Sequence, residues 1–184
     1  MPTITSVPTI PGQYADAIAS ADEDVIKLQT GVAGSITIFK TFSDAFSGIY
    51  TNNLQVLGVT FNLVGALGDH NEVNHNFVQA STNDGTSFPS DGVTPGTHLN
   101  TIAQGINTAI YGGGTELWGF NAGDWKTAVE NDTVAFKITP PGSPGNIVYV
   151  DQITVTISYI IVIPGNIIQT TIGHLNISDG HIVI

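Results

Sequence analysis

The strand pattern in residues 147–162 constrains the fold of this chain more than any other feature. From Gln152 onward, apolar and polar side chains alternate without a break. One side of the ribbon holds β-branched and aromatic residues and the other holds small polar ones, namely Ile153, Val155, Ile157, Tyr159 and Ile161 against Gln152, Thr154, Thr156 and Ser158. A period of two in such residues is typical of a strand with one buried face. The pattern therefore predicts a packed β-sheet.

Shorter segments of the same character precede this strand, at residues 35–40, 54–64, 74–81 and 133–139. In 54–64 we expect Val56 and Gly58 to face away from Val59 and Phe61. Asp84-Gly85 supplies the positive φ of a tight turn, and the Gly- and Pro-rich residues 85–105 predict a long loop. Short strands joined by such connections predict an all-β fold, an antiparallel β-sandwich of jelly-roll-like form.

The two ends of the chain are expected to be extended arms. Residues 1–24 contain three prolines, which favour an extended arm or an edge segment because proline lacks the amide donor of a sheet ladder. Residues 25–163 would hold the β-sandwich domain. Residues 164–184 predict a C-terminal β extension, either a hairpin on its own domain or a strand that reaches onto another subunit. For residues 14–29, a helix and a loop entering a short strand at 25–28 fit the sequence equally well.

Composition excludes several classes of function. The formal net charge of the 184 residues is −11 and the four basic residues are all lysine, so the cationic field that binds nucleic acid cannot be assembled. Anionic membrane surfaces are disfavoured for the same reason. Cysteine is absent, which removes disulfides and thiolate sites. We also expect neither a membrane-spanning helix nor a secretory signal, because the required apolar runs are missing.

The strongest candidates for metal ligands are four residues in one short segment, Asp69, His70, Glu72 and His75. Imidazole and carboxylate ligands suit zinc and other first-row divalent ions. A strand would place His70 and Glu72 on one face and His75 on the other, so these groups do not converge without a bend. We therefore expect a solvated loop, no metal and no cofactor.

Aromatic side chains are the candidates for ligand binding. Trp118 lies between Leu117 and Gly119 and is expected to close one end of the core, with its indole nitrogen on a backbone carbonyl. Trp125 has charged neighbours and is expected to be partly exposed. Trp125 and Tyr111 are thus candidates for a carbohydrate-stacking platform, although packing is the commoner role. No catalytic motif appears, which predicts a non-enzyme.

Three motifs follow one another along the second half of the chain. They are Leu117-Trp118-Gly119, then Val134-Ala135-Phe136, then Tyr149-Val150-Asp151, which leads into the alternating strand that ends at Tyr159. This block resembles the closing half of a β-sandwich module of bacteriophage virion proteins, such as head and tail fibres and capsid decoration proteins. The turn Asp84-Gly85-Thr86-Ser87-Phe88 also fits that module. The resemblance extends over residues 54–160, and in it Trp118 and Asp151 hold the fold.

The resemblance implies a non-enzymatic virion structural protein, made in the host cytoplasm, that serves as a capsid decoration, head fibre or tail appendage. Its implied partners are copies of itself in a homotrimer, other virion proteins and a host surface glycan, with no nucleic acid and no membrane. One alternative is a carbohydrate-binding or adhesive β-sandwich module that uses Trp125 or Tyr111. Another is a self-assembling filament subunit whose terminal strands complement a neighbour.

Overall fold

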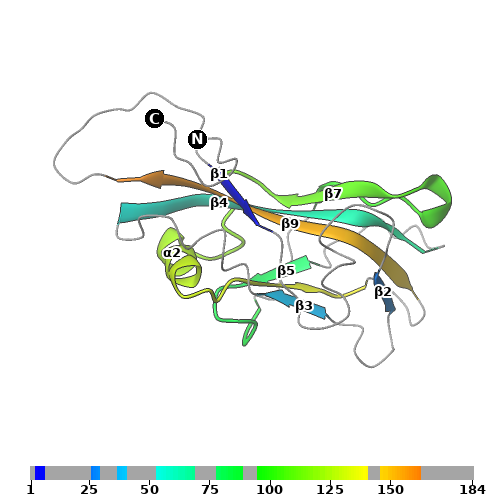
Figure 1. The fold of residues 1–184 in the computed structure, drawn as a ribbon, viewed down its shortest axis with the longest axis horizontal. Coiled ribbons are helices and arrows are strands. Elements are labelled where there is room, and N and C mark those ends of the chain that lie inside the picture. Colours follow the sequence, from blue (N-terminus) through cyan, green and yellow to red (C-terminus); the bar gives the residue numbers. More distant parts are fainter. Residues whose placement is uncertain are drawn as a thin grey trace.

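The computed structural model describes residues 3–6, 26–29, 37–40, 53–68, 78–88, 95–140 and 146–162. These residues form two antiparallel β-sheets and an α-helix (Figure 1). The predicted antiparallel β architecture is therefore confirmed in this part of the chain. Residues 1–2 and 7–24 of the expected N-terminal arm and the whole C-terminal extension, 164–184, lie outside the described residues.

The larger sheet, called sheet A here, has the strand order β1-β9-β4-β7-β6. In addition, β2 pairs with residues 147–150 of β9, whereas β1 pairs with residues 155–158. Its strands are β1 (Thr3–Ser6), β2 (Ile26–Gln29), β4 (Leu54–Leu67), β6 (Pro95–Thr97), β7 (Asn107–Gly112) and β9 (Ile147–Ile161). The two longest strands, β4 and β9, pair along almost their whole length and form the frame of the sheet. Thr3–Ser6 is thus an edge strand, one of the two forms expected for the N-terminal segment.

The smaller sheet, sheet B, has the order β3-β8-β5, with β3 at Thr37–Lys40, β5 at Val78–Ser81 and β8 at Ala135–Ile138. It lies below sheet A in Figure 1, and the helix α2 (Ala122–Glu130) lies in the same lower layer. The ring of Phe61 on β4 meets that of Phe136 on β8, with centroids 4.7 Å apart. The core therefore lies between the two layers.

Two β-bulges correct the predicted side-chain alternation. On β4, Val56 pairs with Tyr159 and Gly58 with Ser158, so Leu57 is an extra residue. An extra residue reverses the alternation, which places Val56 on the buried side together with Val59, contrary to the prediction. On β9 the extra residue is Asp151, which is buried. The buried positions are therefore even-numbered before it and odd-numbered after it.

Helix α2 was not predicted. Its first turn is closed by a capping box, in which the Asn121 side chain accepts from the Asp124 amide at 2.9 Å and the Asp124 carboxylate accepts from the Asn121 amide at 3.1 Å. Trp125, Ala128 and Val129 form its buried side. The helix considered for residues 14–29 is absent at 26–29, where the alternative, a short strand, is confirmed as β2; residues 14–25 are not described.

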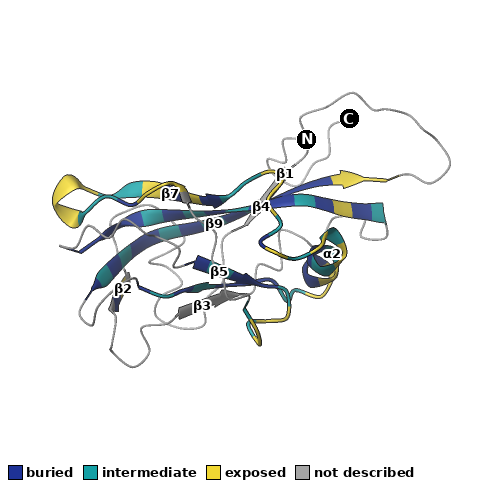
Figure 2. Ribbon diagram, turned by 180° about the vertical axis from the view of Figure 1, so that it is seen from behind, coloured by how far each residue is buried: buried dark blue, intermediate teal, exposed yellow. Residues whose placement is uncertain are grey.

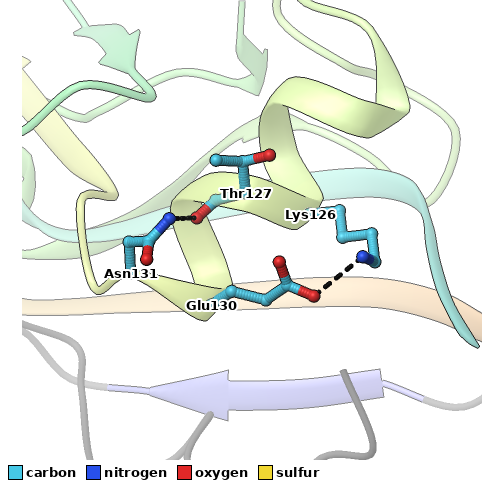
Figure 3. Close-up of polar contacts among 4 residues, drawn as sticks. All are labelled: Lys126, Thr127, Glu130 and Asn131. Carbon is cyan, nitrogen blue, oxygen red and sulfur yellow. Dashed lines mark hydrogen bonds and ion pairs between the residues drawn. The ribbon is translucent and has the colours of Figure 1, made fainter. Parts of the chain in front are cut away.

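The opposite side of α2 is polar. Lys126 and Glu130 form an ion pair of 2.8 Å one turn apart, and the Asn131 side-chain amide donates to the Thr127 carbonyl at 3.0 Å (Figure 3). Both charged side chains are partly exposed, so the ion pair is screened by solvent. These contacts fix the end of the helix without contributing to the core.

The connections differ in part from those expected. The tight turn is confirmed, because Asp84 and Gly85 have φ of 57° and 74° and the Thr86 amide donates to the Asn83 carbonyl at 3.2 Å. The expected long loop at 85–105 is interrupted by β6 and by a 3₁₀ turn at Ile102–Gln104. Of the strand expected at 74–81, only Val78–Ser81 is described, as β5.

Beyond the end of β7 the chain stays against β4. The Val59 amide donates to the Glu116 carbonyl at 2.8 Å, and the Val59 carbonyl accepts from the Gly113 amide at 3.2 Å. The backbone of Gly114 lies so close to Gly58 that a Cβ on Gly58 would overlap it. This close approach brings the segment that carries Trp118 over the inner side of sheet A.

Candidate interaction surface

Trp118 occupies the position expected for it. Its side chain is 4% exposed, and its indole nitrogen donates to the Val59 carbonyl at 2.8 Å. The ring meets Phe136 edge to face, with centroids 5.3 Å apart. The prediction of an indole held by a backbone carbonyl is therefore confirmed.

Trp125 is fully buried, so the expectation of partial exposure is wrong. Its indole nitrogen donates to the Leu117 carbonyl at 2.8 Å, and its ring stacks against Phe136. The prediction inferred exposure from the charged neighbours Asp124 and Lys126, and this inference fails because Trp125 lies on a helix. Consecutive residues on a helix point in different directions, so a charged neighbour does not indicate that the residue beside it is exposed.

Tyr111, the second candidate for carbohydrate stacking, is also fully buried. Its ring lies edge-on to Phe61, with centroids 6.2 Å apart, and burial raises the pKa of its hydroxyl above the ordinary value. Stacking on a sugar requires an exposed ring face. Neither Tyr111 nor Trp125 offers one, so both residues are part of the core and do not form a platform.

The metal candidates Asp69, His70, Glu72 and His75 lie outside the described residues. Within the part of the chain that the structure describes, no three His, Cys, Asp or Glu side chains gather into a group that could hold a metal ion. The same residues contain no helix of the length and apolar character needed to cross a membrane. The buried Asp151 was expected to bond backbone amides, and that remains a prediction.

The outward side of sheet A is the candidate surface that remains. Along β4, β7 and β9, residues between the buried ones turn away from the core, as the alternating colours of β4 and β9 in Figure 2 show. We call this surface the neutral face and define it by eight residues: Thr60, Asn62, Val64, Thr108, Ile110, Gln152, Thr154 and Thr156. The alternation of residues in β9 already places three of them, Gln152, Thr154 and Thr156, together on the polar side of that strand.

The register of the strands assembles the neutral face into rows. Asn62 at the centre pairs with Thr154 on one side and with Ile110 on the other. The Asn62 side-chain amide donates to the Thr154 hydroxyl at 3.2 Å, which fixes both side chains. Rows through Thr60 and Val64 lie on either side of this one, so the three strands present a continuous patch.

The neutral face lacks charge. Strands β4, β6, β7 and β9 contain a single charged residue, Asp151, and that residue is 2% exposed. Three apolar side chains of these strands are exposed, namely Ile110 at 40%, Ile160 at 38% and Ile161 at 44%. Of the described elements, α2 and sheet B lie on the opposite side of sheet A (Figure 1). The chain therefore has a broad strand surface with mixed apolar and uncharged polar character.

Comparison of the chain with protein-family models, with curated proteins and with solved structures found no match.

Sequence reasoning did not identify the neutral face, although one signal was present. The sequence of β4 and β7 contains no charged residue at all, whereas an ordinary solvent-facing strand side carries some.

Proposed function

We propose that this chain is a non-enzymatic structural protein of a bacteriophage virion, a capsid decoration, head fibre or tail appendage built on a jelly-roll-like β-sandwich. The observation that carries the structural role is the neutral face. The virion setting follows from the resemblance of the block from Leu117 to Tyr159 to β-sandwich modules of virion proteins. Its partners are copies of itself and other virion proteins.

The character of the neutral face suits a role in assembly. Depletion of charged residues, more than hydrophobicity, distinguishes the centre of a protein interface from the rest of a surface. A sheet surface with threonine, asparagine and isoleucine offers its shape and its hydrogen-bonding groups for such a contact. None of its eight residues has a carboxylate, imidazole or amine that could act as a general acid or base.

No second function is advanced. The carbohydrate-binding alternative depended on exposed rings at Trp125 and Tyr111, and both rings are buried. The filament alternative depends on residues 164–184, which lie outside the described residues.

Mass spectrometry of purified particles tests the virion role. Particles are prepared from cells in which the gene resides and are purified by density gradient. We expect peptides of this chain to co-purify with the capsid or tail proteins at a constant ratio through successive gradients. An abundant host protein, whose ratio should fall at each step, is the control. Loss of the chain at the same rate as the host protein would refute the proposal.

A further inference from the structure

We propose that Asp84, in the turn that follows β5, is a site of isoaspartate formation and that the hydroxyl of Ser81 controls how fast the modification occurs. Isoaspartate forms without an enzyme and diverts the backbone through the aspartate side chain. The inference concerns the chemistry of this turn alone and does not depend on the virion role proposed above.

The reaction joins an aspartate to the residue that follows it. The Gly85 amide nitrogen attacks the side-chain carboxyl carbon of Asp84 and forms a C–N bond, while one carboxyl oxygen leaves as water and takes the amide proton with it. Water then opens the resulting five-membered succinimide ring. When it adds at the main-chain carbonyl, the chain continues through the side chain as isoaspartate. Nothing is oxidised or reduced, and water is the sole co-reactant.

The turn combines exposure with the residue that hinders this attack least. Asp84 is exposed, and Asp84 and Gly85 have φ of 57° and 74°. A positive φ at the second position favours glycine, because glycine has no Cβ to clash in the left-handed region. The same lack of a Cβ leaves the attacking nitrogen without steric protection. The residue that suits the turn is therefore also the one that makes ring closure easiest.

The fold restrains the attacking nitrogen through Ser81. The Gly85 amide donates to the Ser81 hydroxyl oxygen at 3.1 Å, and Ser81 is fully buried. The Ser81 hydroxyl donates its own hydrogen to the Asn83 side-chain oxygen at 2.7 Å, so its lone pairs are directed to backbone amides. Ring closure requires the Gly85 amide to leave this acceptor and to turn toward the Asp84 carboxyl carbon.

The rest of the turn is held by further hydrogen bonds. The Asp84 amide donates to the Thr133 carbonyl at 2.8 Å. The Asn83 side-chain oxygen accepts from the Ser87 amide at 3.0 Å, and the Asn83 side-chain amide donates to the Ser87 hydroxyl at 2.8 Å. The reactive geometry is therefore reached by local opening of the turn, and the rate of modification follows the fraction of molecules in which the turn is open.

Peptide mapping of the incubated full chain tests the proposal. Electron-transfer fragmentation distinguishes isoaspartate from aspartate, and each protein is incubated at neutral pH both in buffer and in guanidinium chloride, which gives its own unfolded reference rate. We expect folded wild type to form isoaspartate at Asp84 at least about tenfold more slowly than the unfolded chain, because several hydrogen bonds must break. Ser81→Ala should raise the folded rate about two- to tenfold, as expected for the loss of one of them, and leave the unfolded rate unchanged.

Thr86→Ala is the matched control. It removes a hydroxyl from the same exposed turn, whereas Thr86 holds the turn through its amide, which donates to the Asn83 carbonyl at 3.2 Å and is kept in the variant. Its folded rate should equal that of the wild type. An increase in Ser81→Ala but not in Thr86→Ala therefore reports the bond to the Gly85 amide and not a general effect of the substitution.

Circular dichroism checks that each variant is folded. If Ser81→Ala fails to fold, Asn83→Ala decides the test, because Asn83 is exposed and its side-chain oxygen accepts the Ser81 hydroxyl hydrogen. This variant should also raise the folded rate. A folded wild type that forms isoaspartate at Asp84 as fast as the unfolded chain overturns the proposal. A folded Ser81→Ala, or Asn83→Ala in its place, with the wild-type rate does so too.

Discussion

The two faces of sheet A are built from the same strands and satisfy different requirements. On the inner face, Phe61 and Tyr111 lie among rings and are fully buried. On the outer face, Thr60 and Asn62, the immediate neighbours of Phe61, are small, polar and only partly buried. The inner face is defined by side-chain packing, because each aromatic ring has specific neighbours. The outer face is distinguished by the absence of charge, because none of the eight residues of the neutral face is charged.

Strand register decides which residues lie on each of the two faces. A shift by one residue would exchange the two faces, placing Asn62 in the core and Phe61 outside. The bulges at Leu57 and Asp151 shift the alternation within single strands while the buried side stays continuous. Substitutions on the inner face should therefore have large effects on stability, and those elsewhere small ones.

The largest effect is expected for Phe136→Ala. The ring of Phe136 contacts Phe61, Trp118 and Trp125, so its removal leaves a cavity between the sheets. We expect the free energy of unfolding to fall by about 3–5 kcal/mol, measured by denaturant titration. Ile102→Ala, which truncates an exposed side chain, is the control and should change it by less than about 0.5 kcal/mol. Equal losses in the two variants would mean that the inner face does not hold the core together.

Gly58→Ala should follow in size. A Cβ at this position would overlap the Gly114 backbone, which cannot move aside as a flexible side chain would. We expect a loss of about 1–3 kcal/mol, from the midpoint of thermal or denaturant unfolding. Gly113→Ala adds the same methyl group where nothing lies within 4 Å and should be nearly neutral. If Gly58→Ala is as stable as Gly113→Ala, the close approach of residues 113–116 to β4 is wrong.

Alkaline pH should destabilise the protein through the inner face. Burial raises the pKa of Tyr111 above its ordinary value of 10.0, and burial also raises that of Tyr159. Below pH 10 the folded and unfolded states both keep the Tyr111 proton, so this residue adds no pH dependence. Above pH 10 the unfolded chain releases the proton first, and stability falls by up to about 1.4 kcal/mol per pH unit for each such tyrosine. Tyr111→Phe should have a shallower decline, measured by unfolding titrations at successive pH values; an unchanged slope would argue against the burial.

The smallest effect is expected on the solvent side of α2. Glu130→Gln removes the ion pair with Lys126, whose side chains are partly exposed (Figure 3). An exposed pair one turn apart contributes about 0.3–0.5 kcal/mol, so the loss should not exceed that and should vanish in high salt. Denaturant titrations at low and high salt measure it. A loss as large as that of Gly58→Ala would show that the polar side of α2 matters as much as its buried side.

Features that depend on neighbouring residues could be predicted from the sequence. The alternation after Gln152 gave the strand β9 and its buried side, and Asp84-Gly85 gave the turn, because both follow from local backbone preferences. The indole–carbonyl contact of Trp118 was also predicted correctly, since a buried indole nitrogen needs an acceptor.

Features that depend on tertiary contacts could not be predicted in the same way. The bulge at Leu57 exists only relative to the partner strand β9, and no local pattern marks it. Helix α2 had a local signal, the Asn121-x-x-Asp124 capping box followed by Trp125 and Ala128, but nine residues are too few for a clear helical period. The neutral face required the pairing of three strands, which the sequence does not supply.

The two buried indoles have a consequence for local unfolding. Trp125 on α2 donates to the Leu117 carbonyl, and Trp118, one residue further on, donates to the Val59 carbonyl of β4. The helix is thereby linked through a short segment to the central strand of the larger sheet. We expect α2, residues 113–121 and the middle of β4 to exchange their amide hydrogens as one cooperative unit, so that this helix cannot open or be exchanged between chains without disrupting sheet A.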